Sequence, residues 1–181
     1  ASLYGAQQAG WWNEERGTNV LDSGAHFYEV YETADGKWVS IGSLEPQFYA
    51  SLVERLGLAG EDLPERMDRS QWPGLKQRLA EIFVRKTRDE WCSVFEDSDA
   101  CFAPVLSMSE AHEHPHNAAR GTFVLKNGAR QPHPAPRFSR TAAKLGIGPA
   151  KVGEHTDEVL AELGFSLERI ASLRDVGAVQ G

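Results

Sequence analysis

Hydrophobic and polar positions alternate early in the chain in a way that predicts a β-hairpin. Residues 26–33, HFYEVYET, are aromatic and β-branched with near-alternating polarity, which is typical of a strand. Asp35-Gly36 is the strongest short signal for a hairpin turn, and residues 37–43, KWVSIGS, form the returning strand. We therefore expect two antiparallel neighbours joined by a tight turn.

Hydrophobic positions then recur every three or four residues, which predicts helices. One helix is expected from Pro46 to Gly57, and a second around the hydrophobic positions 75–83. Thr87 and Glu90 form a capping-box pattern that predicts the start of a third. Residues 59–74, with their charges, prolines and glycines, are expected to form a loop with one short turn.

The second half of the chain alternates short segments with turns. Residues 101–107, CFAPVLS, predict a short strand that Pro104 confines to a sheet edge, and residues 109–114 predict a helix that Pro115 ends. Residues 121–138 mix short strands and turns, and Gly146–Pro149 predicts a turn.

Two further helices are expected at the end of the chain, with Thr156 and Ser166 as N-caps. His155 is then more consistent with helix initiation than with catalysis. Strands in one cluster and helices in another predict an α+β fold, with an antiparallel hairpin and flanking helices, and argue against regular βαβ units.

Composition narrows the class of protein. The content of 41% hydrophobic and 25% charged residues is ordinary for a globular domain. The net charge of −7 argues against a nucleic-acid-binding protein. The chain carries no apolar run long enough to predict a membrane span. Cys92 and Cys101 fit no disulfide framework or metal motif, which indicates a reducing compartment, and we expect a cytoplasmic location.

A row of histidines is the most obvious candidate for metal binding. His112, His114 and His116 lie at alternate positions beside acidic residues. Alternate positions do not share a helix face, and no second ligand cluster follows at a recognisable spacing. We therefore predict a solvated helix end and no metal site.

Glu45 is the candidate for chemistry. It lies where the returning strand meets the helix that Pro46 begins, in GSLEPQFYA. One interpretation is a helix-start acid, favoured by the helix dipole. The other is a carboxylate on the rim of an apolar surface that orients a histidine from another chain segment. The residues alone favour the first interpretation.

Longer stretches of the sequence resemble the C-terminal half of the family III CoA-transferase group, in its α-methylacyl-CoA racemase branch. The resemblance rests on LDSGAHFY, ADGKW and IGSLEPQFY, then on DACFAPVLSMSEAHEHPHNAARGTF, and on the tail GEHTDEVLAELGFSLERIASLRDVGAV. It covers essentially the whole chain. The first three motifs match the racemase branch, whereas the tail motif is common to the group.

The resemblance implies an organisation that composition does not show. Residues 1–25 would be a linker and the end of a large-domain helix, residues 26–125 a small α+β domain, and residues 126–181 a helical segment that returns to the large domain. Two subunits would interlock, with each active site between the large domain of one and the small domain of the other. The partners would be an acyl-CoA substrate and the large domain or a second subunit.

The resemblance also assigns residue roles. Glu45 would orient a catalytic histidine of the first half, and Leu21, Tyr28 and Leu44 would line the acyl-chain side of the site. The reaction implied is racemisation of 2-methylacyl-CoA thioesters by 1,1-proton transfer at the α-carbon, with no cofactor because CoA is part of the substrate. The family's catalytic histidine and aspartate motifs are absent, so this chain alone would be inactive. Asp22 does not match the catalytic aspartate. A family CoA-transferase and a non-catalytic interaction domain are the alternatives.

Overall fold

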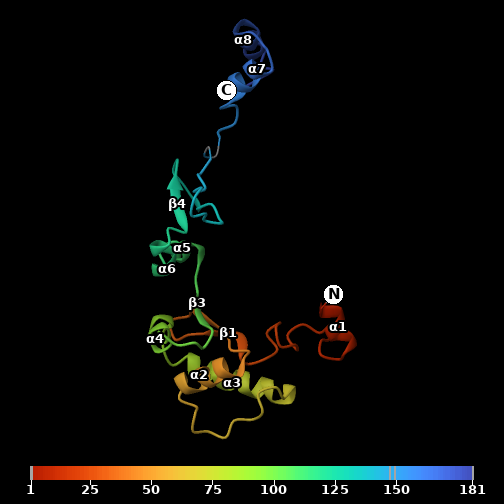
Figure 1. The fold of residues 1–181 in the computed structure, drawn as a ribbon, viewed down its shortest axis with the longest axis vertical. Helices are drawn as coiled ribbons and strands as arrows, with labels where there is room; N and C mark the ends of the chain where they lie inside the picture. The colour runs from red at the N-terminus through yellow and green to blue at the C-terminus, as the bar shows by residue number, and fades with distance from the viewer. Residues whose placement is uncertain (1, 147, 149, 181) are drawn as a thin grey trace. The chain divides into compact units, whose positions relative to one another are not determined.

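A computed structural model describes residues 2–146, 148 and 150–180 and divides the chain into two compact units, Ala1–Ser107 and Met108–Gly181. Ile147 and Pro149, in the turn predicted at 146–149, lie outside the described residues. Each unit is built from its own elements (Figure 1). The domain limits expected from the resemblance, at residues 25 and 125, stay a prediction.

The first unit contains a three-stranded antiparallel sheet in the order β1-β2-β3. Its strands are β1 (Tyr28–Glu32), β2 (Trp38–Gly42) and β3 (Phe102–Val105). Tyr28 pairs with Gly42 and Ile41 with Phe102, so the hairpin and the edge strand containing Pro104 are as predicted. Gly36 has a φ of 70°, the left-handed conformation that the hairpin turn requires.

Helices cover one face of this sheet, where α2 and α3 lie beneath β1 (Figure 1). The helical elements of the first unit are α1 (Ser2–Gln8), α2 (Pro46–Arg55), a 3-10 turn (Arg69–Gln71), α3 (Trp72–Phe83) and α4 (Arg88–Val94). Gly57 follows α2 in the left-handed conformation, and Thr87 with Glu90 forms the predicted capping box. Helix α3 begins two residues before the end of the predicted loop, because Pro73 suits a first helical turn.

The main hydrophobic core lies between the sheet and these helices. Val39 and Ile41 point inward from β2, and Phe83 stacks on Tyr31 with ring centroids 5.0 Å apart. The buried members of this cluster are Tyr31, Val39, Ile41, Leu52, Leu58, Leu79, Ile82, Phe83, Trp91, Phe95 and Ala100. This arrangement confirms the predicted α+β class with an antiparallel sheet and flanking helices.

The hairpin turn is bonded to the start of α4, far along the chain. The backbone N–H of Ala34 donates to the carbonyl of Lys86 over 2.9 Å. The carboxylate of Asp35 accepts from the Thr33 hydroxyl at 2.6 Å and from the Arg88 N–H at 3.1 Å. The turn and the helix start therefore hold each other in place.

A compact turn precedes β1 without forming a helix or strand. Asn19 is buried, and its side-chain amide donates to Asp22 at 2.7 Å. The Gly24 N–H donates to the Asn19 carbonyl at 3.0 Å. A Cβ at Gly24 would lie 2.3 Å from that carbonyl oxygen, so only glycine fits this turn.

The second unit contains a two-stranded antiparallel sheet and four short helices within the described residues. The elements are α5 (Met108–Ala111), α6 (Pro115–Ala119), β4 (Phe123–Lys126), β5 (Ala129–Pro132), α7 (Thr156–Glu162) and α8 (Leu167–Asp175). Ser166 caps α8 as predicted, because its hydroxyl accepts from the Arg169 N–H.

Two predictions for this unit were wrong. Pro115 does not end a helix but begins α6, since proline is well accommodated at a first helical position that needs no N–H donor. Thr156 is not an N-cap; the N-cap residue of α7 is His155, and the Thr156 hydroxyl donates to the Gln180 carbonyl at 2.7 Å. No helix in the part of the chain that the structure describes is long and apolar enough to cross a membrane.

Candidate functional site

The junction between β2 and α2 is held by hydrogen bonds on both sides. The Ser43 N–H donates to the carbonyl of Phe27 at 2.9 Å, and its hydroxyl donates to the carbonyl of Ala100 at 2.6 Å. The Gly42 N–H donates to the Cys101 carbonyl at 2.9 Å. These hydrogen bonds fix the backbone at the end of β2, two residues before Glu45.

Glu45 is the N-cap residue of α2, with an extended backbone at φ −78° and ψ 147°. Its carbonyl accepts the first helical bond from the Tyr49 N–H at 3.0 Å, but its side chain makes no capping hydrogen bond. The carboxylate is exposed and has no hydrogen-bond or ion-pair partner within the described residues. A carboxylate used only as a cap would bond to the backbone N–H groups of the first turn, and this one does not.

The charge of Glu45 acts on the thiol of Cys101. Burial raises the pKa of the Cys101 thiol, and the negative charges of Asp99 and Glu45 raise it further. The thiol therefore stays protonated at neutral pH and reports on the charge beside it.

The three other candidate residues lie at different depths around this junction. Leu21, in the turn before β1, is exposed on about half of its surface, at 51%. Tyr28 on β1 is 37% exposed, and its ring faces Gly42. Leu44 is half-buried and packs beside Phe27 and its neighbours. Leu21 and Tyr28 thus expose apolar surface to solvent, whereas part of the Leu44 side chain is buried against the core.

A shallow pocket of about 300 Å³ opens beside Tyr28. Its lining residues are Ser23, Tyr28, Glu29, Val30, Ser40, Ile41, Gly42 and Cys101. Leu21, Leu44 and Glu45 are not among them. Of the four candidate residues, only Tyr28 lines this pocket, together with Cys101.

A buried aromatic cluster packs against Leu44 and Tyr49, on either side of Glu45 in the chain. The patterns in the sequence did not predict this cluster. Phe27 makes edge contacts with the rings of His26, Tyr49 and Trp72, at centroid distances of 5.1, 5.9 and 6.3 Å. The guanidinium of Arg66 lies over two of these rings, 5.3 Å from the Phe27 centroid and 5.5 Å from that of Tyr49. The only signal in the sequence was the high aromatic content of residues 26–28 and 48–49.

His26 is the buried titratable group of this cluster. Its Nε2 lies 3.0 Å from the Tyr49 hydroxyl, and its Nδ1 has no hydrogen-bond partner among the residues that the structure describes. Burial, together with the nearby Arg66 cation, lowers the pKa of His26 to about 4. The imidazole is therefore neutral at physiological pH and acts as a structural ring.

Asp22 is occupied by the turn before β1. Its carboxylate accepts from the Asn19 N–H and from the Asn19 side-chain amide, both at 2.7 Å. Desolvation opposes ionisation, but these hydrogen bonds prevail and lower the pKa of Asp22. The carboxylate serves the fold of the turn.

The histidine row runs from the turn after α5 into α6. His114 is the N-cap residue of α6, His116 lies inside that helix, and His112 Nε2 lies 3.5 Å from the Glu113 carboxylate. Within the described residues no three His, Cys, Asp or Glu side chains are grouped so that they could hold a metal ion. The prediction that the row binds no metal stays open to measurement.

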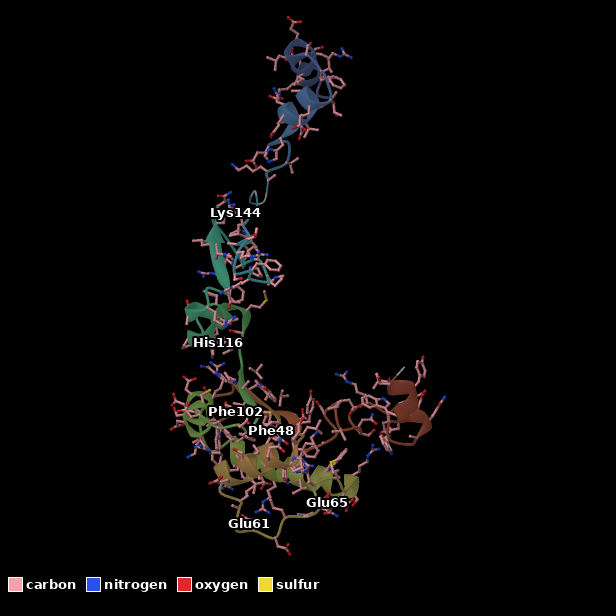
Figure 2. The ribbon with its side chains drawn as sticks, in the orientation of Figure 1. Phe48, Glu61, Glu65, Phe102, His116 and Lys144 are labelled. Atoms are coloured by element: carbon pink, nitrogen blue, oxygen red, sulfur yellow. The ribbon has the colours of Figure 1, made fainter. Side chains whose placement is uncertain are left out.

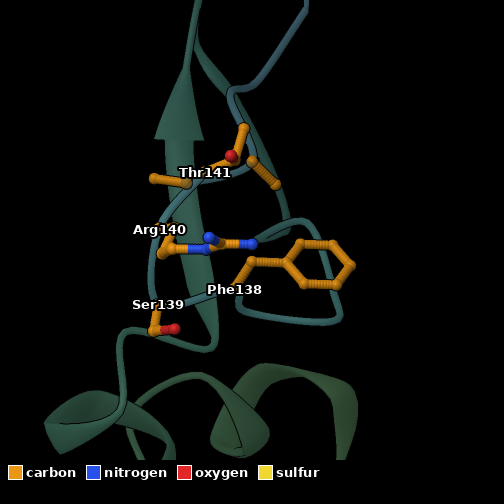
Figure 3. A pocket seen from close by; sticks show the side chains of 6 residues that line it. Phe138, Ser139, Arg140 and Thr141 are labelled. Atoms are coloured by element: carbon orange, nitrogen blue, oxygen red, sulfur yellow. The ribbon is translucent and has the colours of Figure 1, made fainter.

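The second unit carries a pocket of about 580 Å³ lined by residues 138–143. In Figure 3 the Arg140 side chain extends toward the Phe138 ring, with Ser139 and Thr141 on either side. Residues 120–151 contain seven Lys and Arg and no Asp or Glu. This positively charged stretch contrasts with the negative charge of the chain as a whole.

Comparison with known families identifies the class of protein. A model of CoA-transferase family III matches residues 3–156, and the chain therefore belongs to this family. A solved structure of a CAIB/BAIF family protein from Brucella suis matches with a TM-score of 0.67 at 20% identity, over 90% of this chain and 44% of that one. The fold is therefore shared with that protein.

Individual curated proteins of similar sequence include racemases and CoA-transferases. "Alpha-methylacyl-CoA racemase" of Mus musculus is 47% identical over 176 residues, which are 94% of this chain and 45% of that protein. The human protein of the same name is 42% identical over 173 residues, again 94% of this chain and 45% of the relative. A succinyl-CoA–L-malate CoA-transferase beta subunit of Chloroflexus aurantiacus is 31% identical over 83% of this chain and 42% of its own. The chain thus spans less than half the length of these relatives.

Proposed function

We propose that the chain forms the C-terminal part of an α-methylacyl-CoA racemase, an isomerase of lipid metabolism that inverts the α-carbon of 2-methylacyl-CoA thioesters. The observation that carries this proposal is the identity of 47% to a racemase over 94% of the chain, against 31% to a CoA-transferase of the same family. We expect the enzyme to act in the cytoplasm and to need no cofactor, because CoA belongs to the substrate.

The proposed reaction needs two proton-transfer groups on opposite faces of the substrate. The thioester acidifies the α-hydrogen, a base removes it to give an enolate, and an acid on the other face returns a proton. The family resemblance assigns these two groups to a histidine and an aspartate outside this chain. The contribution of this chain is then to complete the site as a second domain, from a homodimer partner or the same polypeptide.

Glu45 is proposed to orient that histidine. An exposed carboxylate on a fixed backbone, with no partner of its own within the described residues, is free to accept a hydrogen bond from an imidazole N–H. Such a bond holds the ring in one tautomer and stabilises its protonated form. Leu21, Tyr28 and Leu44 are proposed to provide the apolar surface for the acyl chain, with Tyr28 beside the pocket.

The test is Glu45→Gln in the full-length protein that contains this chain, measured by α-proton exchange of a 2-methylacyl-CoA in deuterated water. We expect kcat to fall by about 10- to 100-fold with KM little changed, because the orienting charge acts on the transition state. Glu54→Gln, an exposed acid at the other end of α2, is the matched control and should leave kcat unchanged. Unchanged kcat in Glu45→Gln would reject the orienting role.

The wild-type protein tests the reaction itself. Exchange of the α-proton without transfer of CoA to a free carboxylic acid supports the racemase. Transfer of CoA without exchange would assign the transferase reaction known among its relatives. Absence of both reactions, with a folded protein, would leave an interaction domain.

A further inference from the structure

Arg66 links the aromatic cluster to the backbone that carries Glu45. Arg66 lies in the loop between α2 and α3. Its chain neighbour Glu65 is labelled in Figure 2, as is Phe48 of α2. One guanidinium N–H donates to the carbonyl of Leu44 at 2.5 Å. The carbonyl of Arg66 in turn accepts from the Trp72 indole N–H at 2.9 Å. Arg66 is thus anchored at its backbone and bonded at its tip.

The Leu44 carbonyl belongs to the peptide group that joins Leu44 to Glu45. A bond to this oxygen fixes the plane of that peptide and therefore the direction in which the Glu45 Cα–Cβ bond leaves the chain. Pro46 restricts Glu45 to the extended conformation that the structure shows. Pro46 thus limits the φ and ψ angles of Glu45, and Arg66 holds the peptide group before it. The backbone of Glu45 therefore has little conformational freedom.

The same guanidinium also contacts Tyr49, in the helix that follows Glu45. It lies over the Tyr49 ring, and the Tyr49 N–H donates to the Glu45 carbonyl at 3.0 Å. Tyr49 is itself fixed by its hydroxyl contact with His26 at 3.0 Å. One planar side chain therefore contacts both the residue before Glu45 and the residue whose N–H donates the first helical hydrogen bond to the Glu45 carbonyl. A lysine ammonium cannot reproduce this geometry.

We propose that Arg66 is a positioning residue that sets the orientation of Glu45 toward its catalytic partner. This inference rests on the proposed role of Glu45 in the racemase reaction. The competing role for Arg66 is purely structural, as a cation that covers the Phe27 and Tyr49 rings. A positioning role requires that the effect of Arg66 on turnover be transmitted through the Glu45 carboxylate, whereas a structural role does not.

The experiment is a double-mutant cycle in the full-length protein, with Arg66→Met, Glu45→Gln and both together. We expect Arg66→Met to lower kcat by about 10-fold with KM within about two-fold, since a small misplacement of an orienting group is costly. In the Glu45→Gln background the same change should lower kcat by less than about two-fold. Equal losses in the two backgrounds, or an unchanged kcat in a folded Arg66→Met protein, would overturn the proposal.

Arg69→Met is the matched control. Arg69 also lies over an aromatic ring, 5.7 Å from the Trp72 centroid, and also donates to a backbone carbonyl, that of Trp11. It makes no bond to the Leu44 carbonyl, so kcat should not change. If Arg66→Met does not fold, Arg66→Lys enters the cycle in its place, because it retains a cation and a donor but loses the planar geometry.

A second readout separates this inference from the proposed reaction. The Glu45 charge raises the pKa of the Cys101 thiol, so we expect the alkylation rate of Cys101 to respond to that charge. This rate can be measured on this chain with Cys92 replaced by serine. Arg66→Met should shift the rate toward that of Glu45→Gln, and Arg69→Met should not. If the wild-type protein shows no α-proton exchange, the proposed function fails, but this shift still decides whether Arg66 sets the position of Glu45. An unchanged alkylation rate of Cys101 in Arg66→Met would overturn the proposal that Arg66 positions Glu45.

Discussion

Replacement of His26 by glutamine is expected to remove most of the pH dependence of stability of the first unit. The pKa of His26 falls from an ordinary 6.5 to about 4 in the folded chain, mainly because the ring is buried. Between these values the unfolded chain binds a proton that the folded chain does not. Stability from the neutral ring is therefore fully present above pH 6.5 and is lost as the pH falls toward 4.

The size of this effect follows from the same two values. Lowering the pH from 7.5 to 4.5 should reduce the free energy of unfolding by about 2.5 kcal/mol through this histidine. At a typical urea dependence for a domain of this size, the urea midpoint would fall by about 1 M. His26→Gln cannot bind the proton, so it is expected to be less stable at pH 7.5 but nearly independent of pH over this range.

The sequence makes the assay selective. All five tryptophans and only one histidine, His26, lie within residues 1–107. Tryptophan emission during urea unfolding therefore reports on the first unit, and His155→Gln in the second unit is a control that should retain the wild-type pH dependence. A His26→Gln protein with the same loss of stability between pH 7.5 and 4.5 as the wild type would refute the reasoning.

Two further predictions concern the site and its supporting turn. Glu45→Gln should speed alkylation of Cys101 at pH 8 by up to about two-fold in a Cys92→Ser background, because removal of the Glu45 charge lowers the pKa of the thiol. An unchanged rate would contradict an effect of the Glu45 charge on this thiol. Gly24→Ala should destabilise the chain by more than about 2 kcal/mol in urea unfolding, because its Cβ would overlap the Asn19 carbonyl. Gly74→Ala, in an open position of α3, should instead stabilise it by about 0.5–1 kcal/mol, and equal effects of the two changes would reject the steric argument.

Local signals in the sequence were enough to predict most elements. Asp35-Gly36 and the capping box of Thr87 and Glu90 act over three or four residues, so the sequence alone specifies them. Pro115 shows the limit of such signals, since the same residue can follow a helix or begin one. The hydrogen bond that the Thr156 hydroxyl makes to Gln180 likewise depends on a contact 24 residues away.

The site was predictable only in part, for the same reason. The position of Glu45 at a strand-to-helix junction follows from local pattern, and the structure places it there. The hydrogen bond from Arg66 to the Leu44 carbonyl joins residues 22 positions apart. The burial of His26 depends on Tyr49, 23 residues away. No short pattern encodes contacts of this range.

The bonds at the hairpin turn have a practical consequence for engineering. Hairpin tips are usually good places for an inserted tag or a new chain terminus, because they are exposed and few contacts cross them. Here Ala34 and Asp35 are tied to Lys86 and Arg88, so an insertion would pull the tip away from α4. The exposed residues 59–60, where Gly60 has open space around it, are the better insertion point in this unit.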